Sequence, residues 1–171
     1  MRVEDKMLAC ARKSMISAGY CFFISQDKMG RSNARIMQPF EPEEDMTIFF
    51  GTSPKSRKVH EIKTNPNVTL AYYDPEEIAY VTLIGKAKVE KNIHNHWDRW
   101  HETWKRYFPE GPESEDYVLL EFLPSRIEIL SFTEGAIHQS FHLRPDVLLR
   151  LENEWVMAEV EDEEEQISAE E

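Results

Sequence analysis

The chain has 171 residues, 41% of them hydrophobic and 30% charged, and its net charge at pH 7 is −12. This length predicts one domain with a core of its own. The acidic balance argues against nucleic acid as a partner, because phosphate contacts require a basic face. No stretch reaches the roughly 20 apolar residues of a membrane helix. With no signal peptide at its start, we expect a cytoplasmic protein without a membrane partner.

The N-terminal third of the chain is predicted to begin with one helix, which three short strands follow. Residues 3–18 place apolar side chains at intervals of three and four, which predicts a helix, and Gly19 ends it. Aromatic and β-branched residues then predict strands at 20–25, 32–38 and 46–50. Turn residues between the first two of these strands predict a hairpin.

The middle of the chain opens with a second predicted helix, at residues 53–64. Ser53 can cap its N-terminus and Pro54 suits its first turn, and an Asn-Pro step ends it. Two strands are predicted after this helix, at 67–73 and 78–89, with a polar Asp-Pro turn between them.

The C-terminal part has less regular patterns. A helix is predicted at 92–107, where three tryptophans recur at helical spacing, and a short helix at 143–151. Between these helices, residues 117–123 and 126–132 are predicted as one last strand or a bent pair of strands.

These elements together predict a mainly β fold with inserted helices. Closely spaced strands joined by hairpins favour an antiparallel sheet over a doubly wound parallel one, and about six strands can close into a small barrel. We expect one domain over residues 1–158. Residues 159–171 hold eight acidic residues and no basic one, so charge repulsion predicts a disordered tail there.

Several common catalytic and metal-binding motifs are absent from the sequence. The six glycines form neither a GxGxxG nor a GxxxxGK motif, and neither GxSxG nor HExxH occurs. His94 and His96 would point in different directions on a helix, and His138 with His142 lacks an evident third ligand. We therefore expect no metal site and assign no catalytic residue.

The segment Thr52 to Lys58 carries three hydroxyls and three cations in seven residues of an acidic chain. It lies where a strand end opens into a helix, and the first N–H groups of a helix attract anions. A capped, exposed basic turn would have the same composition. Arg35 favours the anion site, because a cation within a strand needs an anionic partner or solvent. If Arg35 and Lys58 meet, two separate elements converge on one phosphate.

Five sequence blocks, taken in order, carry a resemblance to a known family. They are Arg35-Ile36-Met37, Ile48-Phe49-Phe50-Gly51-Thr52, Ser56-Arg57-Lys58-Val59-His60-Glu61-Ile62, Asn65-Pro66-Asn67-Val68-Thr69-Leu70 and Gly85-Lys86-Ala87-Lys88-Val89. This pattern resembles the FMN-binding split barrels related to pyridoxamine 5′-phosphate oxidase, in the branch of general stress protein type. The resemblance covers residues 15–132, which is most of the chain.

The resemblance implies a six-stranded antiparallel Greek-key split barrel and a homodimer with FMN at its interface. The residues implied to hold the phosphate are Arg35, Arg57 and Lys58, with hydroxyls from Thr52, Ser53 or Ser56. The backbone at Ile36 and Met37 is implied to face the isoalloxazine ring. Candidates for the flavin edge, or for contacts from the partner subunit, are Tyr80, Trp100 and Trp104.

The implied activity is that of an FMN-dependent oxidoreductase with an unknown substrate and NADH or NADPH as electron donor. Two alternatives stay open: a non-enzymatic flavin-binding module that buffers flavin or senses redox stress, and the same barrel holding haem or a deazaflavin. Vitamin B6 oxidation is not expected. Tyr80 stands where the oxidase carries a glutamine, and the C-terminal tryptophan and arginine of the oxidase have no clear match.

Overall fold

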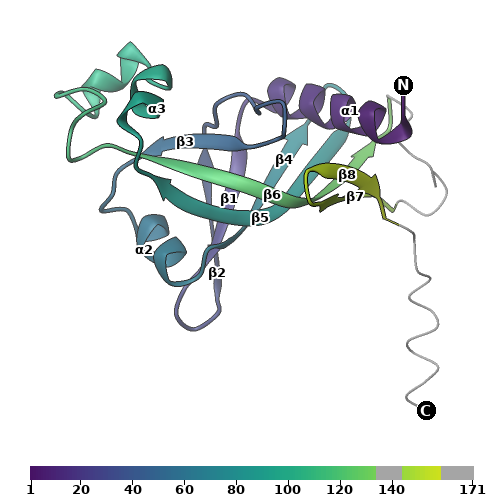
Figure 1. The fold of residues 1–171 in the computed structure, drawn as a ribbon, viewed down its shortest axis with the longest axis horizontal. Coiled ribbons are helices and arrows are strands. Elements are labelled where there is room, and N and C mark those ends of the chain that lie inside the picture. The colour runs from purple at the N-terminus through teal and green to yellow at the C-terminus, as the bar shows by residue number, and fades with distance from the viewer. Residues whose placement is uncertain (134–143, 159–171) are drawn as a thin grey trace.

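The computed structural model describes residues 1–133 and 144–158. Its elements, in chain order, are α1 (Val3–Ala18), β1 (Cys21–Gln26), β2 (Ser32–Met37), β3 (Ile48–Thr52), α2 (Arg57–Thr64), β4 (Asn67–Asp74), β5 (Ala79–Glu90), α3 (Ile93–Asp98), the 3₁₀-helix η1 (Glu102–Arg106), β6 (Val118–Ser131), β7 (Asp146–Leu151) and β8 (Glu154–Met157). All of these strands pair antiparallel (Figure 1). The predicted mainly β architecture is confirmed.

The described part of the chain has eight strands where six were predicted. The six predicted strands correspond to β1–β6, and the two additional strands form the β7–β8 hairpin, which pairs with β6. The expected acidic tail, 159–171, and the pair His138 and His142 lie outside the described residues.

The sheet forms an open barrel in which β6 has a central place. The strand order is β2-β1-β4-β5-β6; residues 118–122 of β6 pair with β3, and residues 126–129 pair with β7. Among the described strands, β2 pairs with β1 alone and β3 with β6 alone, so the barrel is open between β2 and β3. The chain crosses from β2 to β3 and returns to β4 beside β1, which is a Greek-key route.

Apolar side chains fill the interior of the barrel. Along β4 and β5, buried side chains alternate with more exposed ones, as the period of two in a strand requires. Phe23 of β1 meets Phe50 of β3 edge to face, with ring centroids 5.4 Å apart, although these strands are not paired. This aromatic contact therefore joins the two sides of the open barrel.

The helices cover the ends of the sheet. α1 lies next to β4, β5 and β8, while α3 and η1 extend from the opposite end of the molecule (Figure 1). α2 packs against β1 and β5. Gly19 follows α1 with φ 68°, a left-handed conformation that glycine adopts easily, as the sequence pattern predicts.

The second helix begins later than predicted. Its N-cap is Ser56 and its first residue is Arg57, so Ser53 and Pro54 precede the helix. The Ser53 hydroxyl accepts a hydrogen bond from the Lys55 N–H at 3.3 Å. This local bond closes a turn instead of the first helical turn.

The predicted helix at 92–107 is broken in two. α3 ends at Asp98 and η1 starts at Glu102. The Tyr117 hydroxyl donates a hydrogen bond to the Arg99 carbonyl at 3.1 Å, whereas a continuous helix would use that carbonyl in its own ladder. The break therefore depends on a residue distant in the sequence.

The prediction of a short helix at 143–151 is wrong. Leu143 lies outside the described residues, and Asp146–Leu151 forms β7, which pairs with β6 and β8. A short apolar run suits a buried strand and a helix equally well. Pairing with a neighbouring strand decides between them here.

Candidate anion-binding site

The predicted cationic segment lies between the end of β3 and the first turn of α2. Thr52 is buried at the end of β3, and Ser56 caps α2 with an extended backbone (φ −69°, ψ 147°). The Ser56 side chain makes no cap hydrogen bond, and its Oγ is buried without a hydrogen-bond partner in the described structure. The N–H groups of the first helical turn have no intrahelical acceptor, so this turn presents donors that an anion can satisfy.

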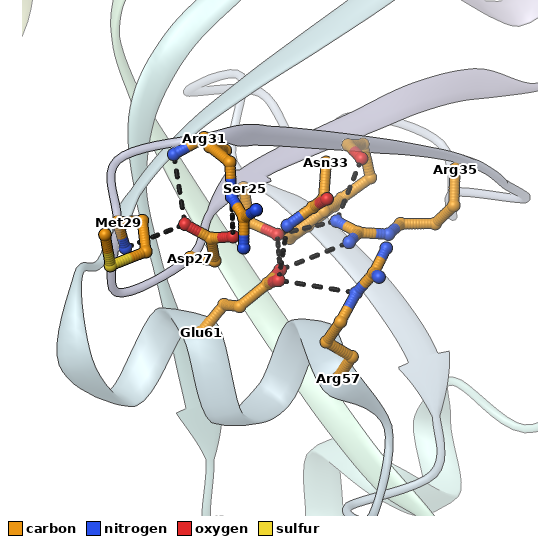
Figure 2. A network of polar contacts seen from close by, with 9 residues as sticks. Ser25, Asp27, Met29, Arg31, Asn33, Arg35, Arg57 and Glu61 are labelled. Carbon is orange, nitrogen blue, oxygen red and sulfur yellow. Dashed lines mark hydrogen bonds and ion pairs between the residues drawn. The ribbon is translucent and has the colours of Figure 1, made fainter.

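Arg35 reaches the helix α2 from β2. Its guanidinium donates hydrogen bonds to the Phe23 carbonyl at 3.2 Å, to Ser25 Oγ at 2.6 Å and to Glu61 Oε2 at 3.2 Å (Figure 2). The side chain is only 19% exposed. Arg35 is therefore a largely buried cation, fixed between the β1–β2 hairpin and α2.

Glu61, on α2, is the central residue of the polar network in Figure 2. Its side chain is 6% exposed, and each carboxylate oxygen has two partners: Oε2 accepts from Ser25 and Arg35, and Oε1 accepts from Asn33 at 2.8 Å and pairs with Arg57 at 3.4 Å. Burial opposes ionisation, but the hydrogen bonds from Ser25, Asn33 and Arg35 outweigh it and hold the pKa of Glu61 below its usual value.

Glu61 has no role in the site expected from the sequence. Two signals point to it: its i, i+4 spacing from Arg57 on one helix face, and the need of Arg35 for an anionic partner within the sheet. The second signal could not identify which acidic residue pairs with Arg35, because that pairing depends on how α2 packs on β1.

Lys58 completes the cationic cluster. Burial, and then the positive charge of Arg35, lower the pKa of Lys58, and the charge of Glu61 opposes this. The structure thus brings Arg35 and Lys58 close enough for their charges to interact. Within residues 1–133 and 144–158, Lys58 has no hydrogen bond or ion pair from its side chain. It is a half-buried cation that interacts with the charge of Glu61 but forms no direct ion pair in the described part of the chain.

Ile36 and Tyr80 lie on the outer face of the sheet, away from this cluster. They line a hollow of about 410 Å³ together with Phe22, Tyr73 and Thr82. Met37, the neighbour of Ile36, points to the other face and packs against the core, because side chains alternate along a strand. Burial, and then the charge of Glu128, raise the pKa of Tyr80.

Trp100 and Trp104 belong to an aromatic cluster formed by the insertion between β5 and β6. Trp100 packs edge to face on Tyr117, with ring centroids 5.3 Å apart, and on Trp104 at 6.0 Å. Trp104 covers Gly51: a Cβ on that glycine would clash with the indole ring. The cluster therefore packs directly on the strand that ends at Thr52, within the same chain.

The described residues contain no group of three or more His, Cys, Asp or Glu side chains that could hold a metal ion. His96 is buried, and its ring nitrogens lie 3.3 Å from the Pro112 carbonyl and 3.1 Å from the Glu90 carbonyl. Of the helices in residues 1–133 and 144–158, none is long and apolar enough to cross a membrane.

The fold and the cluster define the chain as an open antiparallel barrel with a cationic turn at one strand end. It belongs to the family described as "Pyridoxamine 5'-phosphate oxidase like", which matches residues 10–144. The resemblance inferred from the sequence blocks is thus confirmed.

Known relatives agree with this assignment. General stress protein 26 of Bacillus subtilis is 33% identical over 108 residues, which are 61% of this chain and 75% of that protein. A related protein from Clostridium acetobutylicum has TM-score 0.69 and 17% identity, with coverage of 85% and 95%. An FMN-binding protein of Nostoc punctiforme has TM-score 0.68 and 15% identity, with coverage of 92% and 94%. These structures share the fold, which confirms the split-barrel class.

Proposed function

We propose that this protein binds FMN and that Arg57, Lys58 and Arg35 neutralise its phosphate. The proposal depends mainly on the position of Lys58. A half-buried ammonium beside a second cation, with no ion pair in the described structure, is costly unless an anion joins it.

The charge balance of the cluster favours a phosphate monoester. Three cations surround one carboxylate, Glu61, which leaves two positive charges for a ligand whose phosphate carries about two negative charges. The buried, unpartnered hydroxyl of Ser56 adds a donor at the N-terminus of α2. Thr52 and Ser53 lie just before it. The donor set and the dipole of the helix both fit a phosphate group.

The unpaired edges of β2 and β3 are the place that we propose for the ring of the flavin. The barrel is open between these edges, and the backbone of Ile36 and Met37 lies on the β2 edge, next to Arg35. We place the isoalloxazine along this edge. Trp104, which packs on Gly51, is the nearest candidate for an aromatic contact from the insertion, and Trp100 supports it.

A second copy of the chain would cover the outer face of the sheet. Three large apolar side chains are exposed there: Phe22 by 50%, Ile36 by 64% and Tyr73 by 66%. They surround the hollow that Tyr80 also lines, and a contiguous apolar patch of this kind marks an interaction surface. The homodimer we propose therefore buries this face and forms in the cytoplasm.

The bound flavin would supply hydride or electron transfer, and the protein would hold and orient it. On this basis the chain is an oxidoreductase with NADH or NADPH as donor. Its own residues bind the phosphate, exclude water with the aromatic insertion and keep the edge of β2 accessible. No side chain is assigned a proton-transfer role.

The test is a titration of the purified protein with FMN, riboflavin, a deazaflavin and haem. FMN is expected to bind more tightly than riboflavin, because only FMN carries the phosphate, and the native protein should release a ligand with the mass of FMN. Equal affinity for FMN and riboflavin, or preference for haem, would contradict the proposal. Turnover with NADH or NADPH and an acceptor would support the enzyme, and tight FMN without turnover across donors would favour the binding module.

A further inference from the structure

We infer that Glu61 is an internal anion that competes with the phosphate of the ligand for the cationic cluster and thereby sets the affinity of the site. This inference rests on the proposed phosphate site. It adds that Arg57 exchanges Glu61 for phosphate when the ligand binds, while Arg35 keeps its contacts.

The contacts of Glu61 divide into a fixed part and an exchangeable part. Ser25, Asn33 and Arg35 come from the β1–β2 hairpin and hold the carboxylate through buried or half-buried hydrogen bonds. Ser25 also accepts a hydrogen bond from Arg35, so Ser25, Arg35 and Glu61 form a closed ring. This part has no exposed member and is not expected to open.

Arg57 forms the exchangeable part. Its side chain is 68% exposed, and its contact with Glu61 is one ion pair of 3.4 Å between Nε and Oε1. Because the Arg57 end of this i, i+4 pair is exposed and screened by solvent, the pair contributes little to stability. Arg57 can therefore turn to a stronger anion at low cost. A phosphate at the first turn of α2 would offer it a charge-assisted, bidentate partner.

Competition between Glu61 and the ligand phosphate also explains why a carboxylate lies in a site that we propose to bind an anion. Without Glu61, three cations would meet with no counter-charge in the ligand-free protein. The carboxylate stabilises this ligand-free state, and the same charge repels an incoming phosphate. The affinity for FMN is therefore lower than three cations alone would give, which makes the cofactor exchangeable.

The test is the Glu61→Gln variant, which keeps the shape and one acceptor but removes the charge. Its affinity for FMN is expected to rise about tenfold, since a negative charge beside the phosphate is lost, while its affinity for riboflavin stays unchanged. The melting temperature of its ligand-free form is expected to fall. Glu121→Gln is the matched control, because Glu121 is 19% exposed, pairs with Lys88 and is not part of this network.

A measurement on the wild-type protein does not depend on the folding of a variant. The Nε–H signal of Arg57 in a nitrogen-15 spectrum is expected to shift when FMN binds, while that of Arg35 shifts much less. Weaker FMN binding by Glu61→Gln, or equal shifts of the two arginine signals, would overturn the inference.

If the wild-type protein binds no FMN, the proposed function fails, and inorganic phosphate then decides the inference. Tighter phosphate binding by Glu61→Gln than by the wild type would support it. Unchanged or weaker phosphate binding would reject it.

Discussion

The two faces of β2 differ in the kind of side chain that they present. On the inner face, Arg35 and Asn33 meet Glu61 through directed polar contacts with defined distances. On the outer face, Ile36 and its neighbours present apolar surface and line a hollow. Ligand recognition, as we propose it, depends on charge on one face, and self-association depends on buried area on the other. Substitutions one residue apart should therefore act mainly on different properties, phosphate binding on the inner face and self-association on the outer face.

The largest effect is expected from Arg35→Ala. It removes a main partner of the buried Glu61 carboxylate, and breaking a buried ion pair costs about 3 kcal/mol, so the free energy of unfolding should fall by about that amount. Urea denaturation measures it. Arg31→Ala is the control on the same hairpin, because Arg31 pairs with Asp27 at the exposed surface, and a similar loss in both variants would contradict a special role for the inner face.

Lys58→Met comes next and tests charge without disturbing the Glu61 network. FMN affinity is expected to fall about 10- to 100-fold, as the loss of a charge-assisted hydrogen bond implies, while riboflavin affinity changes little. Stability should hold or improve slightly, because the burial of a charged group and the repulsion of Arg35 disappear, and together they outweigh the lost attraction of Glu61. Isothermal titration calorimetry with both flavins gives the ratio, and equal losses for the two ligands would assign Lys58 to the fold instead.

The variant Ile36→Asp tests the proposed dimer surface on the outer face of the sheet. A charge on the proposed dimer surface should weaken self-association by about tenfold or more, since burying an unpaired carboxylate is costly, whereas the isolated chain should unfold almost as before because this side chain is 64% exposed. Analytical ultracentrifugation over a concentration series measures the association. An unchanged dimer would place the interface elsewhere.

The smallest effect concerns pH. The pKa of Lys58 is lower in the folded chain than its usual value, so the unfolded chain binds more protons, and stability contributed by this group rises with pH through the window just below the usual lysine pKa. Melting temperatures of ligand-free wild type and Lys58→Met, compared across that window, should converge at its upper end. A constant difference would show that the Lys58 environment is not perturbed.

Local sequence patterns predicted the strands well, and they found the cationic turn because hydroxyls and cations cluster there within seven residues. They placed the start of α2 too early, since the Ser53 hydroxyl closes a turn with Lys55. They missed the break near Arg99, which depends on Tyr117. They also left Glu61 without a role, because its partners come from a hairpin more than 25 residues away. The break near Arg99 and the role of Glu61 depend on contacts between residues distant in the sequence, which local patterns do not contain.

Trp104 also gives the protein an optical signal of its own. Its indole lies where a side chain on Gly51 would be, one residue before Thr52 and the cationic turn. A flavin held at that turn would lie close enough to accept excitation energy from the indole. Quenching of the intrinsic fluorescence would then report occupancy of the site in the unlabelled protein, and loss of that signal in Trp104→Phe would identify this ring as its source.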